Sequence, residues 1–526
     1  MEWESELQND RDSSFLLDGI KNGFRLSEPN SVFESAHQKN HPSAFRYKQE
    51  VEKELVNQVK LGHYVLTKNK PSIVSGLAAI PKDDGSVRII HDGSRPVGKA
   101  MNDYSYPNEE KFQSVQNACK IAQQNYFMAK IDLQSAYRSV PIHCEDYTAT
   151  GLQWKFENMD EPCFLFDSRL PFGSNKGPSH FHRLSQAIRR CMVRRGFKGV
   201  VAYIDDFFIA APTYEECDYW MSILIKLIRK LGFLISWKKV VGPTQKLTFL
   251  GVEIDTTQCT LSLDSSKLEK LHSELLRFKK RKRASKQQLQ SLAGRLNWAC
   301  QAIRGGRFFL RRIIDCIMSL KQQRHKAQLS SDFHDDLQWW LSFLHIFNGT
   351  MYISNLIEHV HIDACNIAAG SFWMGRWNYS VFKYDMPKVS TLHINYKEIS
   401  TVVTAVDNWA NMWVGKTVII HTDSVVTKAA INKGYSKNAY VNSLLRKMAW
   451  KCAKWNIKLK AVHVSGCINI MADTISRLHE PKNIERFLQL LGRWHHGPPP
   501  TSPLFTHMSL SAYAFLVDRC CQRRVH

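Results

Sequence analysis

Two adjacent carboxylates, Asp205 and Asp206, are the residues whose types and spacing bear most directly on chemistry. They lie between two short runs rich in β-branched and aromatic residues, 200–203 and 207–210. Such runs predict two strands, with the Asp pair at the turn that joins them. A hairpin that ends in two acids fixes negative charge at one point, where it can bind a divalent metal ion. An acidic surface turn is the alternative, and this segment alone does not decide between the two.

A third carboxylate, Asp132, favours the metal site. It ends the run 127–132, which is again apolar and typical of a strand. Phosphoryl transfer with two metal ions requires acids from separate strands, so that two cations can clamp the attacking and leaving oxygens. We therefore predict that Asp132, Asp205 and Asp206 are metal ligands of a phosphoryl-transfer site.

With these acids the chain resembles the palm domain of reverse transcriptases. Tyr203-Ile204-Asp205-Asp206 is similar to that family's Y-x-D-D box, and Asp132 is similar to the acid that opens its first catalytic motif. The resemblance implies that Asp132 and Asp205 bind both metals and that Asp206 supports them. Two Mg²⁺ ions per site are expected, and Mn²⁺ also suits carboxylate ligands.

Substrate contacts are implied by an upstream segment, 80–90, which predicts a hairpin turning at Asp84-Gly85. In reverse transcriptases the corresponding hairpin contacts the incoming triphosphate, which assigns this role to Lys82 and Arg88. Cations there would neutralise charge as pyrophosphate leaves. For either residue a solvated position on the hairpin is the alternative.

The glycine-rich segment 170–181 resembles the motif that meets template and base, and places Phe172 and Gly173 there. Glycine lets the backbone approach a ligand closely. Gly177 departs from the Ser or Ala common in that family, and a helix is predicted over 183–195. Tyr137 stands five residues after Asp132, where reverse transcriptases place a ring that excludes a ribose 2′-hydroxyl. Ordinary packing is the alternative for Tyr137.

Two further segments follow the polymerase order. The segment 231–239 resembles the motif whose lysine can protonate the leaving pyrophosphate, and the pattern favours Lys239 over Lys238. The segment 247–251 resembles the short strand that grips the primer.

A second set of acids begins after about residue 350. Asp363 and Asp423 each end an apolar strand, Glu398 opens a helical pattern between them, and Asp473 follows the second strand. Strands and helices alternate here, as an α/β layer requires. The set resembles ribonuclease H, whose Asp-Glu-Asp-Asp residues bind two metals and cleave RNA paired with DNA.

The string that carries Asp473 strengthens this resemblance. His463-Val464-Ser465-Gly466, then Asn469, Ala472-Asp473 and Ser476-Arg477, is similar to the H-x-P-G-x-x-N-x-x-A-D-x-x-S-R ending of retroelement ribonuclease H modules, with Ser465 in place of Pro. For Asp473 the alternative is an acid that only stabilises a helix N-terminus.

Composition agrees with a nucleic-acid enzyme. The chain has 526 residues and a formal net charge of +23, which fits a surface that follows phosphate backbones. The densest basic run, 277–283, precedes a helical pattern over 287–298; it is placed in a thumb that grips template–primer phosphates, with nuclear localisation or solvated charge as alternatives. We find no signal peptide, no membrane-length apolar run and no C-x-x-C pair, so a cytoplasmic or nuclear protein that is not secreted and has no membrane partner is expected.

The predicted fold is an α+β right-hand polymerase (fingers, palm and thumb) followed by an α/β ribonuclease H-like domain. The predicted boundaries are a lead-in at 1–60, fingers and palm at 61–255, a helical thumb at 256–328, a connection at 329–355, the ribonuclease H-like domain at 356–480 and an unassigned tail at 481–526.

Within the retroelements, His91-Asp92-Gly93-Ser94-Arg95-Pro96 and Asn102-Asp103 resemble the form found in tyrosine-recombinase retrotransposons, the DIRS and Ngaro groups. The segment 292–298 points the same way. No protease, integrase or recombinase motif is visible, so a recombinase or integrase is expected on another chain.

These resemblances imply an RNA-directed DNA polymerase with fused ribonuclease H, whose partners are an RNA template, a DNA primer, the RNA–DNA hybrid and dNTPs. The alternative is a decayed or domesticated copy that binds nucleic acid without catalysis. An RNA-dependent RNA polymerase shares the chemistry, but Tyr137 and the second set of acids argue against it.

Overall fold

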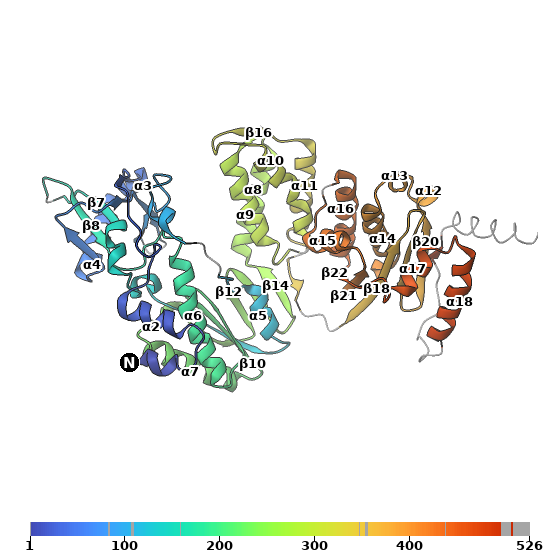
Figure 1. Ribbon diagram of the computed structural model, residues 1–526, viewed down its shortest axis with the longest axis horizontal. Coiled ribbons are helices and arrows are strands. Elements are labelled where there is room, and N and C mark those ends of the chain that lie inside the picture. The colour runs from blue at the N-terminus through green and yellow to red at the C-terminus, as the bar shows by residue number, and fades with distance from the viewer. Residues whose placement is uncertain are drawn as a thin grey trace, which may run out of the picture. The chain divides into compact units, whose positions relative to one another are not determined.

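The structure, a computed structural model, describes residues 2–82, 85–106, 110–157, 159–303, 305–346, 348–352, 356–436, 438–495 and 507–508 (Figure 1). The chain divides into two compact units, one of residues 1–250 with 255–257 and one of residues 251–254 with 258–526. The predicted turn at Asp84-Gly85 falls partly outside the described residues, because Asp83 and Asp84 are not among them.

A four-stranded antiparallel sheet forms the centre of the first unit. Its strands are β6 (Phe127–Asp132), β9 (Val200–Tyr203), β10 (Asp206–Ala211) and β11 (Val241–Thr244), in the order β11-β6-β10-β9. Strands β6, β9 and β10 are the runs of β-branched and aromatic residues from which strands were predicted, whereas β11 was not predicted. Strands β9 and β10 form a hairpin in which Asp206 pairs with Tyr203. Asp206 is therefore the first residue of β10, and only Ile204 and Asp205 form the turn.

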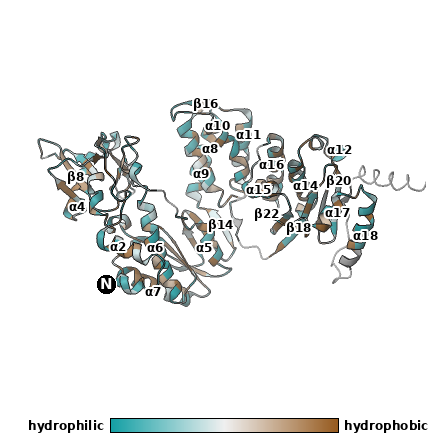
Figure 2. Cartoon of the chain, in the orientation of Figure 1, coloured by the Kyte–Doolittle hydropathy of each residue, from teal (hydrophilic) through white to brown (hydrophobic). Residues whose placement is uncertain are grey.

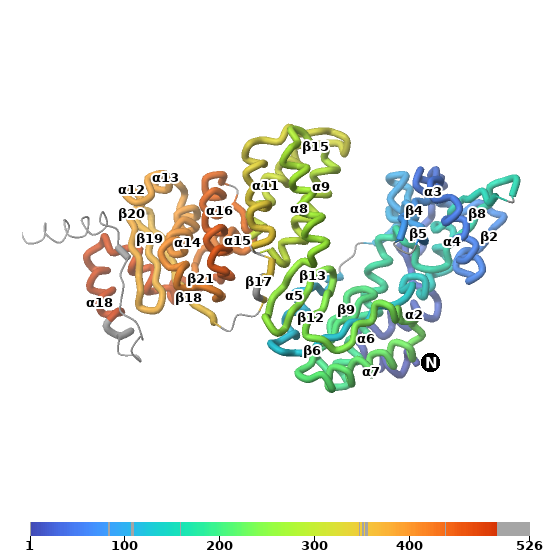
Figure 3. The backbone as a smooth tube through the Cα atoms, turned by 180° about the vertical axis from the view of Figure 1, so that it is seen from behind, coloured from blue at the N-terminus to red at the C-terminus, as the bar shows by residue number. Residues whose placement is uncertain are grey.

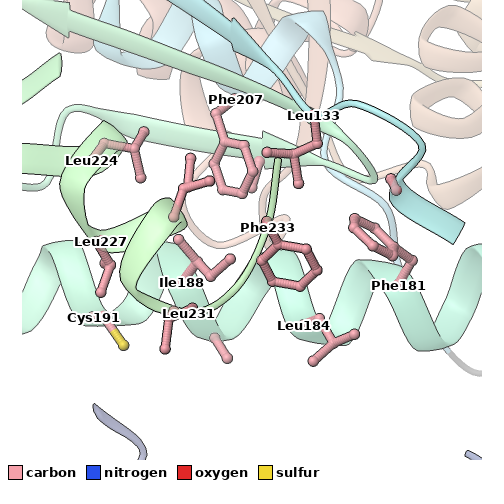
Figure 4. Packing of buried hydrophobic residues seen from close by; sticks show 14 of the residues in the cluster. Leu133, Phe181, Leu184, Ile188, Cys191, Phe207, Leu224, Leu227, Leu231 and Phe233 are labelled. Carbon is pink, nitrogen blue, oxygen red and sulfur yellow. The ribbon is translucent and has the colours of Figure 1, made fainter. Parts of the chain in front are cut away.

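Two long helices, α6 (Gly177–Arg194) and α7 (Tyr214–Lys230), pack against this sheet (Figure 3). Helix α6 begins six residues before the helix predicted over 183–195 and ends one residue before its predicted end. Figure 4 shows how Leu184 and Ile188 of α6 lie beside Phe233, with Phe207 of β10 above them. Burial of these side chains provides the main stabilisation, at roughly 1.5–3 kcal/mol for each large apolar side chain.

In the sequence, the other elements of the first unit come before, between and, for β12, after these strands and helices. A second sheet has the order β1-β3-β7-β8-β2, and β4 pairs with β5 in an antiparallel hairpin. The bounds of the remaining elements are α1 (Glu2–Glu6), α2 (Ser13–Asn22), β1 (Ala36–His37), α3 (Pro42–Arg46), α4 (Lys48–Lys60), β2 (Tyr64–Thr67), β3 (Ile73–Val74), β4 (Leu77–Pro81), β5 (Val87–His91), α5 (Val115–Ile121), β7 (Gly151–Trp154), β8 (Cys163–Asp167) and β12 (Lys246–Phe249).

The N-terminal segment is fastened to α6 by ion pairs. The buried carboxylate of Asp10 accepts hydrogen bonds from Arg190 at 2.6 and 2.9 Å and from Arg194 at 2.9 Å. Closer to the N-terminus, the indole N–H of Trp3 donates a 3.1 Å hydrogen bond to the carbonyl of Leu231, which follows α7. Residues predicted only as a polar lead-in thus include two helices that complete the core of the first unit.

The second unit begins with a helical region. Its long helices include α9, which covers the helix predicted over 287–298, and α11, which lies within the predicted connection at 329–355. Figure 2 shows that these helices carry hydrophilic and hydrophobic residues along their length, as helices with one buried side do. The elements are β13 (Val252–Asp255), β14 (Thr260–Leu263), α8 (Ser265–Lys279), β15 (Arg283–Ser285), α9 (Lys286–Ala299), α10 (Arg311–Met318), β16 (Lys326–Gln328), α11 (Ser331–Phe343) and β17 (Thr350–Met351).

A mixed sheet with the order β22-β21-β18-β19-β20-β23 forms the rest of the second unit. Strand β18 is antiparallel to β19 and parallel to β21, and β21 is parallel to β22. The elements are β18 (Ile357–Ala364), β19 (Ala368–Trp373), β20 (Arg376–Val381), α12 (Phe382–Asp385), α13 (Pro387–Ser390), α14 (Ile394–Trp409), β21 (Thr417–Thr422), α15 (Val425–Lys433), α16 (Ala439–Lys454), β22 (Lys458–His463), α17 (Ile470–Ser476), α18 (Pro481–His495) and β23 (His507–Met508).

The helical region and the mixed sheet share a buried ion cluster within the second unit. Asp336 of α11 accepts a hydrogen bond from Arg312 of α10 at 3.0 Å, and the guanidinium of Arg446 on α16 lies 3.3 Å from the same carboxylate. Burial raises the pKa of Asp336 to about 6, against the opposing charges of Arg446 and Arg312. Helices α11 and α16 also share an edge-to-face pair between Phe343 and Trp450.

Each cysteine of the described residues is a free thiol. Over the same residues, the helices all lack the combination of length and apolar character that a membrane crossing needs.

Candidate active sites

The first candidate site lies where β6 meets the β9–β10 hairpin. Asp132 and Asp206 are register partners on β6 and β10, and the backbone carbonyl of Asp205 accepts a 3.0 Å hydrogen bond from the N–H of Leu133. Three carboxylates predicted from two segments thus lie at the same end of the central strands β6 and β10. This is the arrangement from which acids on different strands can share cations.

The hairpin turn that presents Asp205 is strained. Ile204 has a φ of +51°, in the left-handed region that β-branched residues rarely adopt. Its carbonyl accepts a short hydrogen bond from the hydroxyl of Ser185, a buried residue of α6. The core of the unit therefore holds the turn, which is how strained backbone persists at sites that need a fixed geometry.

Two lysines lie beside these acids. Lys239 bonds to both carboxylate oxygens of Asp132, at 3.1 and 3.2 Å, whereas Lys130 lies 3.7 Å from Oδ1 of Asp206. Burial raises the pKa of Asp205 and that of Asp206, the latter to about 6. The lysine in contact with Asp132 is thus Lys239, which the sequence pattern favoured over Lys238.

This acid set fits a hard divalent cation. Carboxylate oxygens are the ligands that Mg²⁺ and Mn²⁺ prefer, and Oδ1 of Asp206 is buried without a hydrogen-bond partner. A buried acceptor in that condition costs free energy unless something pairs with it.

A ring cluster adjoins the three acids. Tyr137 stacks on Phe172 with ring centroids 5.2 Å apart, and the guanidinium of Arg88 lies 5.0 Å from the centroid of the Phe172 ring. Burial, and then the charge of Asp205, raises the pKa of the Tyr137 hydroxyl. The structure therefore brings Arg88, Phe172 and Tyr137 together next to Asp205. Lys82 is exposed on the same β4–β5 hairpin, with its backbone N–H bonded to Ser86.

Close contacts explain why glycine occupies positions 173 and 177 in the segment 170–181. Gly173 has a φ of +116°, and a Cβ there would lie 1.9 Å from the carbonyl oxygen of His91. At Gly177 a Cβ would lie 3.2 Å from the ring of Tyr137, tighter than an ordinary contact. The departure at Gly177 noted in the sequence thus leaves room for the Tyr137 ring.

The second candidate site lies in the mixed sheet. Asp363 on β18, Glu398 on α14 and Asp423 after β21 bring carboxylate oxygens within 4.8 Å of one another. Over the described part of the chain, no other set of three or more His, Cys, Asp or Glu residues converges as closely. A convergent group of carboxylates fits a divalent metal, whose charge would offset their mutual repulsion.

Burial and mutual repulsion perturb these acids. Burial, followed by the charges of Asp363 and Asp423, raises the pKa of Glu398 to about 8. Burial raises the pKa of Asp363 to about 6, although a hydrogen bond from Ser476 opposes the shift. Perturbed acids of this kind concentrate at functional sites.

Hydrogen bonds orient the ligands of the second site. Thr422 donates to Glu398 at 3.0 Å, Ser476 donates to Asp363 at 2.6 Å, and Arg477 donates to Asp473 at 2.9 Å. Asp473, in the first turn of α17, is ion-paired with Arg477 and is outside the convergent group.

Three of the residues that position the acids were not predicted from the sequence. These are Lys130, Thr422 and Ser476. Lys130 precedes Asp132 by two residues, and Thr422 precedes Asp423 directly, but their partners lie on other elements. Ser476 was noted only as part of a string. Period-two alternation could have placed Lys130 on the face of Asp132.

Comparison with known proteins identifies part of the chain. Residues 80–254 match the family described as "Reverse transcriptase (RNA-dependent DNA polymerase)". The genome polyprotein of Petunia vein clearing virus is 23% identical over 433 residues, which cover 75% of this chain and 17% of that protein. An enzymatic polyprotein of Cassava vein mosaic virus is 22% identical over 436 residues, 77% of this chain and 60% of that protein. The chain therefore spans less than two thirds of these relatives.

Solved structures agree on the fold. The foamy viral protease-reverse transcriptase in complex with double-stranded DNA has a TM-score of 0.53 at 16% identity, covering 88% of this chain and 81% of that one. The same protein in complex with RNA/DNA hybrid has a TM-score of 0.52 at 15% identity, covering 88% and 62%. Residues 80–254 thus resemble the reverse transcriptase family, and the likeness to these solved structures supports the polymerase fold that the sequence predicted.

Proposed function

We propose that this chain is an RNA-directed DNA polymerase with a fused ribonuclease H, which copies retroelement RNA into DNA and degrades the RNA of the resulting hybrid. The single observation that carries the polymerase is the register of Asp132 opposite Asp206, with Asp205 at the adjoining turn, inside the region that matches the reverse transcriptase family. The neighbouring structures bound to double-stranded DNA and to hybrid support nucleic acid as the partner.

In the polymerase reaction, a primer 3′-hydroxyl attacks the α-phosphate of a dNTP and pyrophosphate leaves. Asp132 and Asp205, supported by Asp206, would hold two Mg²⁺ ions, which when bound neutralise charge on the attacking and leaving oxygens. Arg88 and Lys82 bind the triphosphate, and Lys239 is placed to move from Asp132 toward the leaving pyrophosphate and donate its proton. The stacked rings of Tyr137 and Phe172 form the wall that excludes a ribose 2′-hydroxyl.

The nuclease proposal rests on the convergence of Asp363, Glu398 and Asp423 on a mixed sheet flanked by helices. These acids, with Asp473, would hold Mg²⁺, which when bound activates water and stabilises the leaving oxygen. Thr422 and Ser476 orient the acids, a role for which outer-shell partners are suited.

The subgroup proposal is the DIRS and Ngaro group of tyrosine-recombinase retrotransposons. It is supported by the sequence strings at 91–103 and 292–298. In this proposal a recombinase on another chain performs integration.

The test is dNTP incorporation on an RNA template annealed to a DNA primer with Mg²⁺, alongside cleavage of the same hybrid. We expect Asp205→Asn to abolish synthesis and keep cleavage, and Asp423→Asn to do the reverse. Each variant is the matched control of the other. Tight hybrid binding by a wild-type chain that neither synthesises nor cleaves would instead establish a domesticated binding protein.

A further inference from the structure

Helices α14 and α16 cover one face of the mixed sheet of the second unit, whereas on the other face α17 packs against β18 and β19 and leaves residues of β18, β21 and β22 exposed or partly exposed. On β21, Val418, Ile420 and Thr422 are buried, whereas the residues between them are partly exposed. The covered face packs in a core with apolar residues of α14 and α16. Alternation along the strands therefore puts the residues between them on the opposite, open face of β18, β21 and β22.

The open face is rich in cations and imidazoles. It carries Lys458 and Lys460 on β22, His359 and His361 on β18, and His421 on β21. Register places them in adjoining rows: Ile419 pairs with both His359 and Lys460, and His421 pairs with His361. The remaining side chains of this face over 357–361, 417–421 and 458–462 are Ile, Thr or Val, so the face has no acid of its own.

The histidines are held in one arrangement. Nδ1 of His359 lies 2.8 Å from Nε2 of His421, and the ring of His361 stacks on His421 with centroids 4.5 Å apart and planes 12° apart. The two lysines supply positive charge on the face, and the imidazoles supply hydrogen-bonding groups.

The open face leads to the carboxylates of the second site. His361 is two residues before Asp363, and His421 is two residues before Asp423. Residues two apart share a face of a strand, and a strand rises roughly 3.3 Å per residue, so the row from His359 to Asp363 covers about 13 Å. Anything bound along the histidines reaches the acids at the end of the strands.

We propose that this open face binds a sugar–phosphate backbone of the RNA–DNA hybrid and guides it to the carboxylate site. The inference rests on the proposed nuclease function, and it adds a binding site outside the carboxylates. Lysine ammonium groups pair with phosphates without reading sequence. Imidazole N–H groups can donate hydrogen bonds to phosphate oxygens or to the 2′-hydroxyls of the RNA strand.

A protein occupant fits this face less well. The cores of protein interfaces are depleted of charge and rich in large apolar side chains, whereas two exposed lysines stand on the three strands of this face. The charge complements phosphate, and the continuity with the carboxylates selects the hybrid over other polyanions.

The direct test is lysine footprinting of the full chain. Acetylation of each lysine would be measured by mass spectrometry with and without a hybrid, in EDTA so that the hybrid stays intact. We expect the reactivity of Lys458 and Lys460 to fall several-fold while that of Lys383 and Lys388 is unchanged. These control lysines lie on α12 and α13, which follow β20 on the far side of the sheet order. Unchanged reactivity at Lys458 and Lys460 with the hybrid bound, or protection by single-stranded RNA alone, overturns the proposal.

A kinetic test separates this face from the reaction itself. The double variant Lys458→Gln/Lys460→Gln should raise KM for hybrid cleavage about 5- to 10-fold, with kcat unchanged. In this double variant the slope of log affinity for the hybrid against log salt concentration should be smaller in magnitude by about 2, because each phosphate contact contributes roughly 0.9. The matched double variant Lys383→Gln/Lys388→Gln should change neither. Protection without cleavage by the wild type would refute the nuclease and keep the binding face, whereas cleavage with unchanged KM in the Lys458/Lys460 variant refutes the face alone.

Discussion

The ammonium of Lys130 lies 3.7 Å from Oδ1 of Asp206, across the antiparallel pair β6 and β10. It partly offsets the burial that raises the pKa of Asp206 to about 6. Because Asp206 must be ionised to support a cation, synthesis should increase as pH rises through this range. Removing Lys130 should raise the pKa of Asp206 further. The acid limb, which is the rising low-pH part of the pH–rate profile for DNA synthesis, should then move to higher pH.

We therefore predict that Lys130→Met moves the acid limb of DNA synthesis upward by about 1 pH unit, the lower end of the effect of a close opposite charge. Initial rates would be measured at subsaturating Mg²⁺ between pH 5 and 8. Lys130→Arg keeps the charge and should keep the wild-type profile. An unshifted limb in Lys130→Met would show that the lysine does not act on Asp206.

Tyr137→Ala should relax sugar selection. Its ring stacks on Phe172 next to Asp205, and in the proposed function it limits the room for a 2′-hydroxyl. We expect the preference for dNTP over rNTP, as a ratio of kcat/KM, to fall roughly 10- to 200-fold, the range for small steric differences in a pocket. Tyr137→Phe retains the ring and is the control. Equal selectivity in Tyr137→Ala and wild type would mean that the ring only packs.

Glu398→Gln should stabilise the chain at high pH. The pKa of Glu398 is raised from 4.5 to about 8 in the fold, so the folded state retains a proton that the unfolded state has lost. Wild-type stability therefore declines as pH rises from about 4.5 to 8, at up to about 1.4 kcal/mol per pH unit. The gain in Tm for Glu398→Gln should be small at pH 5 and large at pH 8.5. A lower Tm than wild type at pH 8.5 would contradict this account.

Ser476→Ala should weaken the nuclease and spare the polymerase. The substitution removes the 2.6 Å hydrogen bond to Asp363. We expect the half-saturating Mg²⁺ concentration for hybrid cleavage to rise by about 10-fold or more, as for other outer-shell partners. Thr474→Ala on the same helix removes a buried hydroxyl that bonds only to the carbonyl of Ile470, so it serves as the control. If both variants need equal Mg²⁺, Ser476 has no orienting role.

Gly173→Ala should destabilise the first unit severely. A Cβ would lie 1.9 Å from the carbonyl oxygen of His91, at a φ of +116°. We expect a loss of more than about 3 kcal/mol in urea unfolding, because strain and overlap add. Gly196→Ala meets only the strain, since its φ is +95° and no atom lies within 4 Å; about 1–2 kcal/mol is expected there. Similar losses at the two positions would refute the steric argument.

Local patterns predicted much of this fold. The runs that became β6, β9 and β10 were recognisable because each concentrates β-branched and aromatic residues, and α9 because apolar residues recur at helical spacing. The reverse transcriptase resemblance, which came from ordered motifs, is confirmed over residues 80–254. The roles of the individual site residues and the DIRS and Ngaro subgroup stay predictions.

What the sequence did not give depends on contacts between distant segments. Nothing near Asp10 in the chain indicates that it meets Arg190 and Arg194 on α6. Nor does the sequence disclose that Ile204 takes a left-handed conformation, because Ser185 and the packed hairpin impose it. The link between Ser476 and Asp363 is of the same kind. Such pairs depend on the tertiary fold, which local periodicity does not encode.

The buried carboxylate of Asp336 constrains genetic recombination between related copies of this chain. Arg446 on α16 depends on an acid that lies outside the mixed sheet, in the preceding helix α11. A crossover between these two helices that joined unmatched parents would leave a buried charge unpaired, at a cost of about 3–5 kcal/mol. Related genes that exchange the segment encoding this sheet should therefore exchange the segment encoding α10 and α11 together with it.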